Sequence, residues 1–483
     1  MMKKLFFIFS ISLLTFLNFK SSFSHPLLNI NVDDDFIYDN IQASKYSNKQ
    51  VFSIKPLPYI ASILAKSRLN LIANSIERPI KYIKPINTIQ VKTFYTNANY
   101  LLLEGQSGLL LKKGFNLITL EDGQISLGEN FIFYYQLRQI FNDDTKKGEV
   151  LRTYGKFLFG KFSFEAGIDN VNWGNGEYGI LLSNNAYPFP LIKLQTEKPL
   201  NFVGKWSFSI LNGWLFEDRQ DVSNPMLLGI RIVYKPFDFL EIGGTKTTMY
   251  GGDGRPKYKL TEYWQLLTSY RDNIPGDKYD NDSYAGYDIV VYIPNKWTDT
   301  LKIYFEQYGT DIYAFWQKED EGFGSKFPFI FTLLSRAYNI GIFASKNKNI
   351  LRLEYVEIPS VFYYHHWYPH EGYSYKGISL GYPYGRNVKV YFFKFHRWIN
   401  NKNWFTLKTA YFKQLWEREN PEVDNYFVSF EYNKLINKTL QISPFFRIDY
   451  REKFDTNLLP TKFEFNDKSK TFITLGLSIF LRF

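Results

Sequence analysis

Runs in which apolar and polar residues alternate recur along most of the chain. In residues 161–168, apolar side chains at every second position alternate with lysine, serine, glutamate and glycine. Similar runs occupy residues 230–235, 351–355, 428–432 and 440–450, and turn-forming clusters at 235–238, 251–256 and 433–434 lie between such runs. Alternation with a period of two is typical of a β-strand with one apolar and one polar face. The pattern predicts an all-β fold of many antiparallel strands.

The chain ends in a very regular run, T-F-I-T-L-G-L-S-I-F-L-R-F, which spans residues 471–483. Its odd-numbered positions are apolar from Ile473 onward, and its last residue is Phe483. An alternating last strand that ends in phenylalanine resembles the assembly signal of bacterial outer-membrane barrels. We therefore expect Phe483 to be a membrane-assembly signal that is recognised by the barrel assembly machinery.

The N-terminus has the organisation of a secretory signal peptide. Lys3 and Lys4 precede an apolar run from Leu5 to Phe19, and Ser22-Phe23-Ser24 provides small residues at the cleavage positions. The alternative is an uncleaved anchor helix, but the apolar run is shorter than the roughly 20 residues that span a bilayer. We expect residues 1–24 to be removed, so that the mature chain begins at His25.

Composition limits the class of exported protein. Beyond residue 24 no stretch resembles 18 consecutive apolar residues, and the mean hydropathy is −0.28, which excludes a helical membrane protein. Aromatic residues nevertheless make up 19% of the chain, with 46 Phe and 37 Tyr. A membrane barrel can place such rings on its lipid face and at both interfaces, with the charged strand faces toward a polar lumen. The alternative is a β-sandwich with one solvated face.

Chain length then sets the size of the barrel. The patterned region runs from residue 91 to residue 483, and about 22 residues per strand, turns and loops included, gives roughly sixteen to eighteen strands. The sequence thus predicts a closed antiparallel transmembrane β-barrel in the bacterial cell outer membrane. It contains no cysteine, so no disulfide contributes.

Residues 25–90 differ from the rest and are predicted to form an N-terminal periplasmic segment. Five apolar residues at helical spacing predict a short amphipathic helix: Leu57, Ile60, Ile63, Leu64 and Leu71. Such a helix could pack on the periplasmic rim, enter the lumen or bind a partner. The run Asp33-Asp34-Asp35 is predicted to be a solvated stretch.

Candidate chemistry is limited to one histidine-rich segment, H-H-W-Y-P-H-E at 365–371. His365, His366, His370 and Glu371 include the ligand types of zinc. Pro369 excludes a helical metal-binding pair, so an ordered aromatic loop is the favoured interpretation and no metal site is predicted. The turn at 251–256 lacks the Lys-Ser/Thr of a P-loop, and no G-x-S-x-G element is present. We therefore predict no catalytic residues and no cofactor.

Net charge gives a modest indication of the partner. Loss of Lys3, Lys4 and Lys20 with the signal peptide lowers the formal net charge from +11 to +8. A basic barrel favours anionic partners, such as acidic polysaccharide or the phosphates of lipopolysaccharide, and nothing indicates nucleic acid. The alternative is an ordinary lumen that is lined by charges of both signs.

Three motifs resemble the capsule assembly Wzi family. The first is D-N-V-N-W-G-N-G-E-Y-G-I-L-L-S-N-N-A-Y-P-F-P at 169–190, with the Trp-Gly-x-Gly element and a Leu-Ser-Asn-Asn-Ala segment. The second is L-E-I-G-G-T-K-T-T-M-Y-G-G-D-G-R-P at 240–256, followed by Arg271-Asp272-Asn273, and the third is G-Y-S-Y-K-G-I-S-L-G-Y-P-Y-G at 372–385. The chain departs from the family at Tyr187, where a basic residue is expected, and at Tyr382, where histidine is expected.

The resemblance implies an outer-membrane barrel of about eighteen strands with a helical element on the periplasmic side. It also implies a lectin-like, non-catalytic role in holding capsular or other extracellular polysaccharide at the cell surface. Outer-membrane lipid, lipopolysaccharide and the barrel assembly machinery are the other expected partners.

Rings that stack on sugars and amides that bind hydroxyls mark five candidate binding residues, namely Trp173, Asn184, Asn185, Trp367 and Tyr368. Each also has a structural interpretation, as a girdle aromatic or as part of a turn. The alternative functions are a diffusion porin or sugar channel and, third, a barrel enzyme that acts on lipid. An open lumen favours the channel, whereas a plugged lumen favours attachment.

Overall fold

The computed structural model describes residues 29–43, 53–57, 81–128, 130–269, 272, 274, 276–313, 332–414, 422–452, 454–455, 464–465 and 469–483. The predicted signal peptide, with its cleavage position after Ser24, lies outside the described residues. So do Ile60, Ile63, Leu64 and Leu71 of the predicted amphipathic helix.

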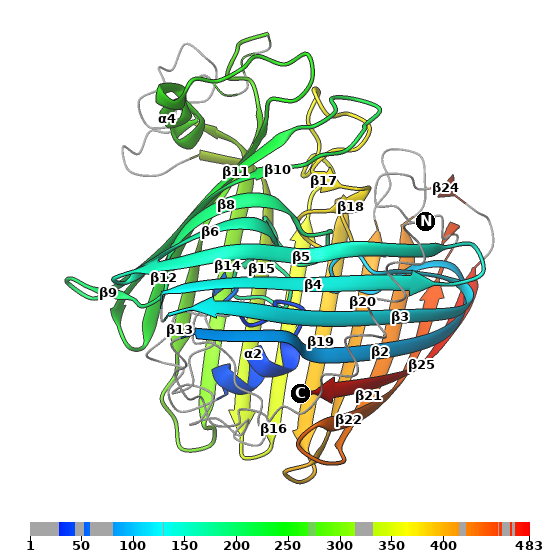
Figure 1. Cartoon of the computed structure of the whole chain (residues 1–483). Coiled ribbons are helices and arrows are strands. Elements are labelled where there is room, and N and C mark those ends of the chain that lie inside the picture. Colours follow the sequence, from blue (N-terminus) through cyan, green and yellow to red (C-terminus); the bar gives the residue numbers. More distant parts are fainter. Residues whose placement is uncertain are drawn as a thin grey trace.

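Eighteen antiparallel strands form one closed barrel (Figure 1). They are β2 (Lys81–Leu102), β3 (Leu110–Leu127), β4 (Phe131–Phe141), β5 (Lys146–Phe159), β6 (Phe162–Asp169), β8 (Phe189–Thr196), β10 (Lys205–Trp214), β11 (Met226–Phe237), β12 (Leu240–Tyr250), β13 (Asp282–Tyr292), β14 (Thr300–Tyr313), β15 (Thr332–Lys346), β16 (Asn349–Ile358), β19 (Val388–Trp398), β20 (Asn403–Gln414), β21 (Val423–Leu435), β22 (Leu440–Arg451) and β25 (Lys470–Arg482). The predicted all-β barrel is confirmed, and its size agrees with the upper end of the predicted range. Its first strand begins at Lys81, so the boundary predicted at residue 91 was too late.

Short elements accompany the barrel. A helix, α2 (Asp35–Gln42), precedes it, and further helical turns η4 (Leu260–Glu262) and α4 (Tyr263–Thr268) lie in the connection between β12 and β13. Two-residue strands form the pairs β1 (Ile54–Lys55) with β7 (Asn172–Trp173), β17 (Ser374–Tyr375) with β18 (Ile378–Ser379), and β23 (Phe454–Asp455) with β24 (Glu464–Phe465), while β9 (Leu200–Asn201) pairs with β10. Within the described part of the chain, no helix is long and apolar enough to cross a membrane.

The predicted solvated stretch at Asp33–Asp35 is instead the start of this helix. Asp34 is the N-cap of α2, because its carboxylate accepts a hydrogen bond from the main-chain N–H of Ile37 at 3.1 Å. The Asp33 carboxylate accepts hydrogen bonds from Ser107 and Asn184. The side chains of Asp33 and Asp34 are therefore hydrogen-bonded within the fold, and the prediction of a solvated stretch was wrong for both.

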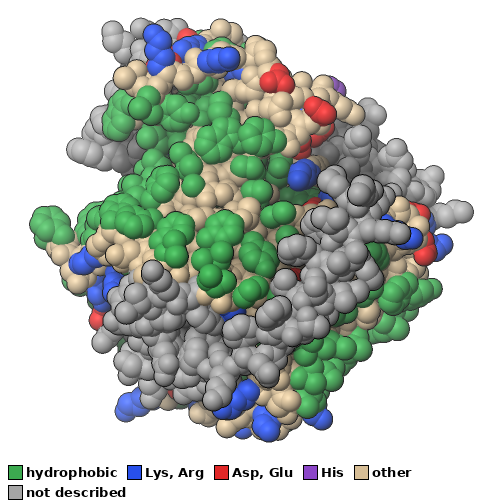
Figure 2. Space-filling model, in the orientation of Figure 1, with side chains coloured by type: hydrophobic (Ala, Val, Ile, Leu, Met, Phe, Trp, Pro, Cys, Tyr) green, Lys and Arg blue, Asp and Glu red, His purple; other side chains and the backbone are tan. Residues whose placement is uncertain are grey.

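Alternate residues along each strand point to the outer and the inner face of the barrel wall. On β16, Leu351 and Leu353 point outward, while Arg352 and Glu354 are buried inside. On β25, Ile473, Leu475 and Leu477 are exposed on the outer wall. Figure 2 shows hydrophobic side chains gathered over the visible barrel wall. An apolar exterior around a charged interior is the arrangement of a barrel that lies in a membrane.

Connection lengths orient the barrel. Turns are short at one end, as at 160–161, 347–348 and 436–439, and long at the other, as at 170–188, 251–281 and 359–387. Outer-membrane barrels have short periplasmic turns and long extracellular loops, which assigns the two ends. A row of tyrosines marks the extracellular interface, since consecutive strands from β16 to β22 pair Tyr355, Tyr391, Tyr411, Tyr426 and Tyr450 in register.

The barrel closes where β25 pairs with β2, from Thr88–Arg482 to Thr96–Thr474. Gly476 lies in this seam opposite Phe94, whose ring packs edge-on against Phe445. A Cβ atom at position 476 would lie 2.5 Å from the Phe94 ring, so only glycine fits without a shift. At the periplasmic end, the main-chain N–H of Phe483 donates to the carbonyl of Asn87 at 3.0 Å. The assembly role of Phe483 stays a prediction.

We predict that Gly476→Val lowers the yield of closed barrel, because the added methyl groups overpack the seam at a cost of about 1–3 kcal/mol. Heat-dependent gel mobility after refolding measures the folded fraction. Gly244→Val on β12 is the matched control, because no atom lies within 4 Å of a Cβ at this exposed position. Equal yields for the two variants would contradict the packing argument.

Candidate functional site

The extracellular loop 170–188, which joins β6 to β8, folds back into the barrel. Its Asn175 amide donates to Asp288 on β13 at 2.7 Å, and Asp288 is held by Arg231 on β11. The main-chain N–H of Glu177 donates to Glu354 on β16 at 2.7 Å. The loop therefore crosses the lumen and contacts wall strands that are distant from its own neighbours.

The Trp-Gly-x-Gly element of this loop is shaped by the close approach of its backbone to the wall. Gly174 has a φ of +128°, and a Cβ atom there would lie 2.8 Å from the Glu306 carboxylate. Any other residue at position 174 would be strained and would also collide with Glu306. The motif thus fits a loop that must pass close to a buried carboxylate.

The N-terminal segment enters the lumen as well. The Asn29 side chain donates to Glu165 at 2.8 Å and to Asp169 at 3.1 Å, both on β6, and accepts from Lys156 at 2.7 Å. On the far wall, Trp398 donates to Asn40 of α2 at 2.8 Å. Figure 1 shows α2 inside the ring of strands. We call residues 29–43, 53–57 and 170–188 together the lumen plug.

The two halves of the lumen plug are joined directly. β1 pairs with β7, and the main-chain N–H of Gly174 donates to the carbonyl of Ser53 at 3.0 Å. The Asn184 amide nitrogen lies 3.0 Å from the carbonyl of Val32, 3.0 Å from the Asp33 carboxylate and 2.6 Å from the carbonyl of Gly105. One buried amide therefore ties the extracellular loop to the N-terminal segment and to the β2–β3 connection.

Both halves of the lumen plug also form ion pairs with the same cationic side chains of the barrel wall. Arg352 pairs with Asp39 at 3.1 Å and with Glu177 at 3.3 Å. Lys394 on β19 pairs with the same two carboxylates, each at 2.7 Å, and Lys408 on β20 pairs with Glu177 at 3.2 Å. The α2 carboxylate and the loop carboxylate are thus neutralised by the same guanidinium and ammonium groups.

The charges of this network determine how the two carboxylates titrate. Burial alone would raise the pKa of Glu177, but Lys394, Lys408 and Arg352 together hold this pKa well below its ordinary value of 4.5. Burial opposes ionisation of Asp39 too, and Lys394 and Arg352 still keep its pKa below 3.8. Both side chains are therefore carboxylates at neutral pH, and their pairing stabilises the lumen plug.

A cavity of about 440 Å³ remains between the N-terminal half of the lumen plug and one side of the wall. Its lining carries both signs of charge, including Lys84, Asp122, Arg447 and Arg482. This cavity agrees with the alternative interpretation of the charge balance, a lumen lined by both cations and anions.

A group of cations surrounds an aromatic ring at the extracellular rim. The Arg138 guanidinium lies 5.2 Å from the centre of the Tyr187 ring, and the ammonium groups of Lys147 and Lys376 lie 5.5 and 5.0 Å from it. Glu149 pairs with Arg138 and Lys147, each at 2.7 Å. We call these five residues the Tyr187 cluster.

The Tyr187 cluster is partly accessible. Tyr187 is half-buried, the Lys147 side chain is 48% exposed and Lys376 is exposed. Burial lowers the pKa of Lys376, and the neighbouring cation of Lys147 lowers it further. Such a site suits an anion with an apolar face that can lie on the ring.

The five predicted sugar-binding residues are not brought together as one site. Trp173, Asn184 and Asn185 are at most 1% exposed and belong to the lumen plug, so they offer no surface to a polymer here. Tyr368 is also fully buried, and its hydroxyl donates to the carbonyl of Gly251 at 3.1 Å. Trp367 is half-buried, with the Arg255 guanidinium 4.0 Å from its ring centre.

Arg138, Lys147 and Lys376 lie far apart along the chain, so no sequence motif predicted that they would meet. The one available signal was Tyr187, which stands where the resemblance leads us to expect a basic residue. The structure places three basic side chains around this ring instead.

The histidine-rich segment is partly assembled. Among the described residues, His365 and His366 come together with Asp280 from another loop in an arrangement that could hold a metal ion. The other two candidates lie apart, since the main-chain N–H groups of His370 and Glu371 donate to Asp221.

Comparisons with known proteins agree with this architecture. A family described as "Capsule assembly protein Wzi" matches residues 97–459. A stretch of 124 residues is 27% identical to the "Uncharacterized 55.8 kDa protein in cps region" of Klebsiella pneumoniae, and it spans 24% of this chain and 24% of that relative.

Among solved structures, the Escherichia coli outer-membrane protein Wzi, described as a carbohydrate-binding β-barrel involved in group 1 capsule assembly, is 15% identical. It aligns with a TM-score of 0.67 over 95% of this chain and 100% of that one, which shows the shared fold. Pseudomonas aeruginosa OccK2 (OpdF), 10% identical with a TM-score of 0.49 over 82% and 98% of the two chains, is too distant to support an argument.

We predict that Glu177→Gln loosens the lumen plug. The substitution keeps the shape of the side chain but leaves Lys394, Lys408 and Arg352 with fewer anions, and breaking a buried ion pair costs about 3–5 kcal/mol. Urea unfolding of the refolded barrel should show lower stability, and planar-bilayer conductance should rise. Glu422→Gln is the control, because this side chain is 54% exposed. Unchanged stability and conductance in Glu177→Gln would show that the network does not hold the loop.

Acid should act on the same network. A carboxylate with a depressed pKa stabilises the folded state at pH values above its unfolded pKa, and this contribution is lost as the pH falls through the folded value. Because the ordinary values are 4.5 for Glu177 and 3.8 for Asp39, conductance should stay constant between neutral pH and these values and rise only below them. A rise that is complete near neutral pH would assign the response to other groups.

Proposed function

The chain belongs to the capsule assembly protein Wzi family, and from this premise we propose that it holds capsular or other extracellular polysaccharide at the cell surface. In this role it is an outer-membrane binding protein, lectin-like and without catalysis. Binding requires only an accessible, complementary surface, so no cofactor takes part.

The single observation that carries the proposal is the lumen plug. A diffusion porin or sugar channel needs a continuous aqueous path, whereas here two segments from opposite ends of the barrel share the cations of Arg352 and Lys394. Most residues of the plug are buried and its two segments are bonded to each other and to the wall, which supports a rigid platform for the extracellular loops. The porin alternative lacks an observation of this kind in its favour.

The Tyr187 cluster supports an acidic polymer as the ligand. Three cations around one half-buried ring exceed the anions near them, Glu149 and Glu217, the second of which accepts a hydrogen bond from the main-chain N–H of Lys376. Acidic sugars combine carboxylates or phosphates with apolar ring faces, and this site offers a partner to each. Outer-membrane lipid, lipopolysaccharide and the barrel assembly machinery stay part of the proposal as further partners.

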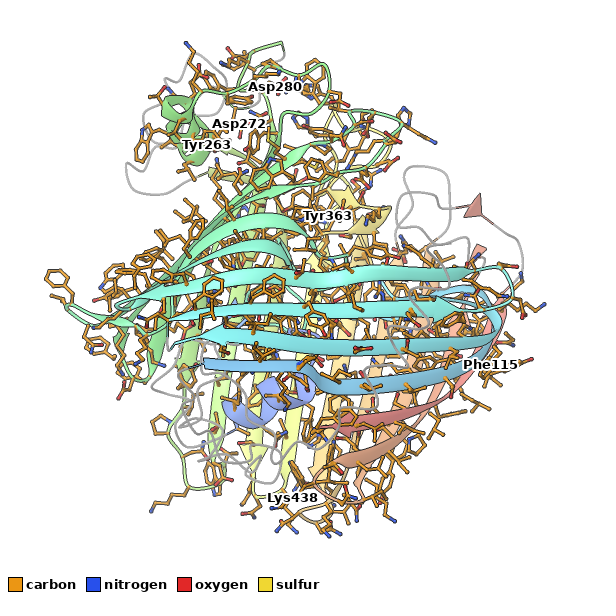
Figure 3. All side chains as sticks on the ribbon, in the orientation of Figure 1. Phe115, Tyr263, Asp272, Asp280, Tyr363 and Lys438 are labelled. Carbon is orange, nitrogen blue, oxygen red and sulfur yellow. The ribbon has the colours of Figure 1, made fainter. Side chains whose placement is uncertain are left out.

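We predict that the double variant Lys147→Gln/Lys376→Gln weakens binding of the cell's own acidic polymer by about fivefold to thirtyfold, which corresponds to roughly 1 kcal/mol or less per lost surface ion pair. Binding to wild-type barrel should weaken as salt shortens the screening length from about 10 Å at 0.1 M to about 3 Å at 1 M. Lys438→Gln removes one lysine charge in the periplasmic turn, at the opposite end of the barrel (Figure 3), and should leave binding unchanged.

The same variants decide the function in cells. A deletion strain should release its polymer into the medium while total polymer synthesis stays the same. Expression of wild-type protein or Lys438→Gln in this strain should restore attachment, whereas expression of the double variant should not. A deletion strain that keeps its polymer on the surface but loses uptake of a small solute would replace the attachment function with the porin.

A further inference from the structure

Two extracellular loops bring one carboxylate and two imidazoles together, and none of the three belongs to the lumen plug or to the Tyr187 cluster. Asp280 lies in the connection between β12 and β13, which forms the projection above the barrel in Figure 3. His365 and His366 come from the connection between β16 and β19. The ligand atoms of the three side chains all lie within 4.8 Å of one another. We propose that Asp280, His365 and His366 bind a divalent cation of the zinc class.

Two of the ligand atoms are buried without a hydrogen-bond partner. His365 is 8% exposed and Asp280 is fully buried, yet neither Nε2 of His365 nor Oδ1 of Asp280 makes a hydrogen bond. Leaving buried polar atoms unpaired is costly, so each such atom needs an explanation. A cation between them would satisfy both.

The distance between His365 and Asp280 fits two ligands of a tetrahedral ion better than a direct hydrogen bond. Nε2 of His365 lies 3.5 Å from Oδ1 of Asp280, which is too long for a good N–H to O contact. Ligands about 2.0–2.1 Å from a tetrahedral zinc ion lie about 3.4 Å from each other. The third ligand, Nε2 of His366, lies 2.8 Å from Oδ2 of Asp280, and a bound ion would replace this hydrogen bond.

Neighbouring donors hold the carboxylate in position. The indole N–H of Trp367 donates to Oδ2 of Asp280 at 2.9 Å, and the Arg255 guanidinium donates to the Asp280 main-chain carbonyl at 2.5 Å. Metal-ligating carboxylates are themselves hydrogen-bonded in this way, which fixes their orientation. This arrangement leaves Oδ1 directed toward His365.

The donor set and its exposure indicate which ion binds and how it enters. Two imidazoles with one carboxylate favour zinc over calcium or magnesium, which prefer oxygen ligands. The His366 side chain is 50% exposed, so the ion has access from solvent and a fourth position on that side for water. A bound ion would clip the β12–β13 loop to the β16–β19 loop.

Binding through Nε2 moves the proton of His365 to Nδ1. In the structure Nδ1 accepts from the main-chain N–H of Trp367 at 3.3 Å, a long contact that zinc binding would break. The environment of the Trp367 indole should change at the same time, which gives an optical signal that is independent of polymer binding.

The test uses the full mature chain, refolded in detergent and purified without a histidine tag, and zinc chloride as the probe. Equilibrium dialysis with elemental analysis should find one additional zinc per wild-type chain relative to His366→Gln, together with a change in tryptophan fluorescence and slower proteolysis of the two loops. His366→Gln should weaken zinc binding at least about tenfold, because even substitution of residues that hydrogen-bond to metal ligands typically lowers metal affinity by that factor. His366 is chosen because its side chain is half-exposed.

His370→Gln is the matched control, since His370 lies in the same loop but outside the cluster, and it should bind zinc like wild type. Calcium and magnesium should not compete. Equal zinc binding by wild type and His366→Gln, or equal losses in His366→Gln and His370→Gln, would overturn the proposal. Because zinc is measured without polymer, this outcome is distinct from failure of the proposed attachment function.

Discussion

An antiparallel barrel of eighteen strands encloses more space than its own inward side chains can fill. The interior is charged, because the polar faces of the strands cannot point toward lipid. These two conditions determine most of what lies inside. Charges that are removed from bulk water must be paired, and the extra volume must be occupied by chain that brings the matching charges with it. Asp39 and Glu177 are such charges.

The resulting plug is specified from both ends of the molecule. Arg352 and Lys394 each contact one carboxylate from the N-terminal helix and one from the extracellular loop, so neither segment is neutralised in place without the other. The apolar cluster above this network combines Trp173 and Leu182 of the loop with Phe362 and Tyr373 from the connection between β16 and β19. Charge pairing thus fixes the position of the loop, and apolar burial fixes its packing.

Features that depend on the local residue pattern, such as the strands, could be predicted from the sequence. Contacts between residues that are far apart in the chain could not. Alternation identified the strands, and the charged side of runs such as 351–355 was correctly assigned to the lumen. Trp173, Asn184 and Asn185 were predicted to bind sugar from their residue types alone, although connecting loops that bind ligands normally run over the outside of a protein. In a wide barrel such a loop can instead supply the missing interior. No pattern along the chain indicates that Asp39 meets Arg352, since 313 residues separate them.

The way the extracellular loop is anchored also has a mechanical consequence. In the proposed function, a polymer attached to the loops experiences drag, and the pull reaches the loops before it reaches the wall. Asn175 and Glu177 are fixed to β13, β16, β19 and β20, and Gly174 lies against Glu306 on β14. Attachments to several strands bear a load in parallel, so none of them carries the whole force. The loop that crosses the lumen is therefore also built to resist being pulled out of it.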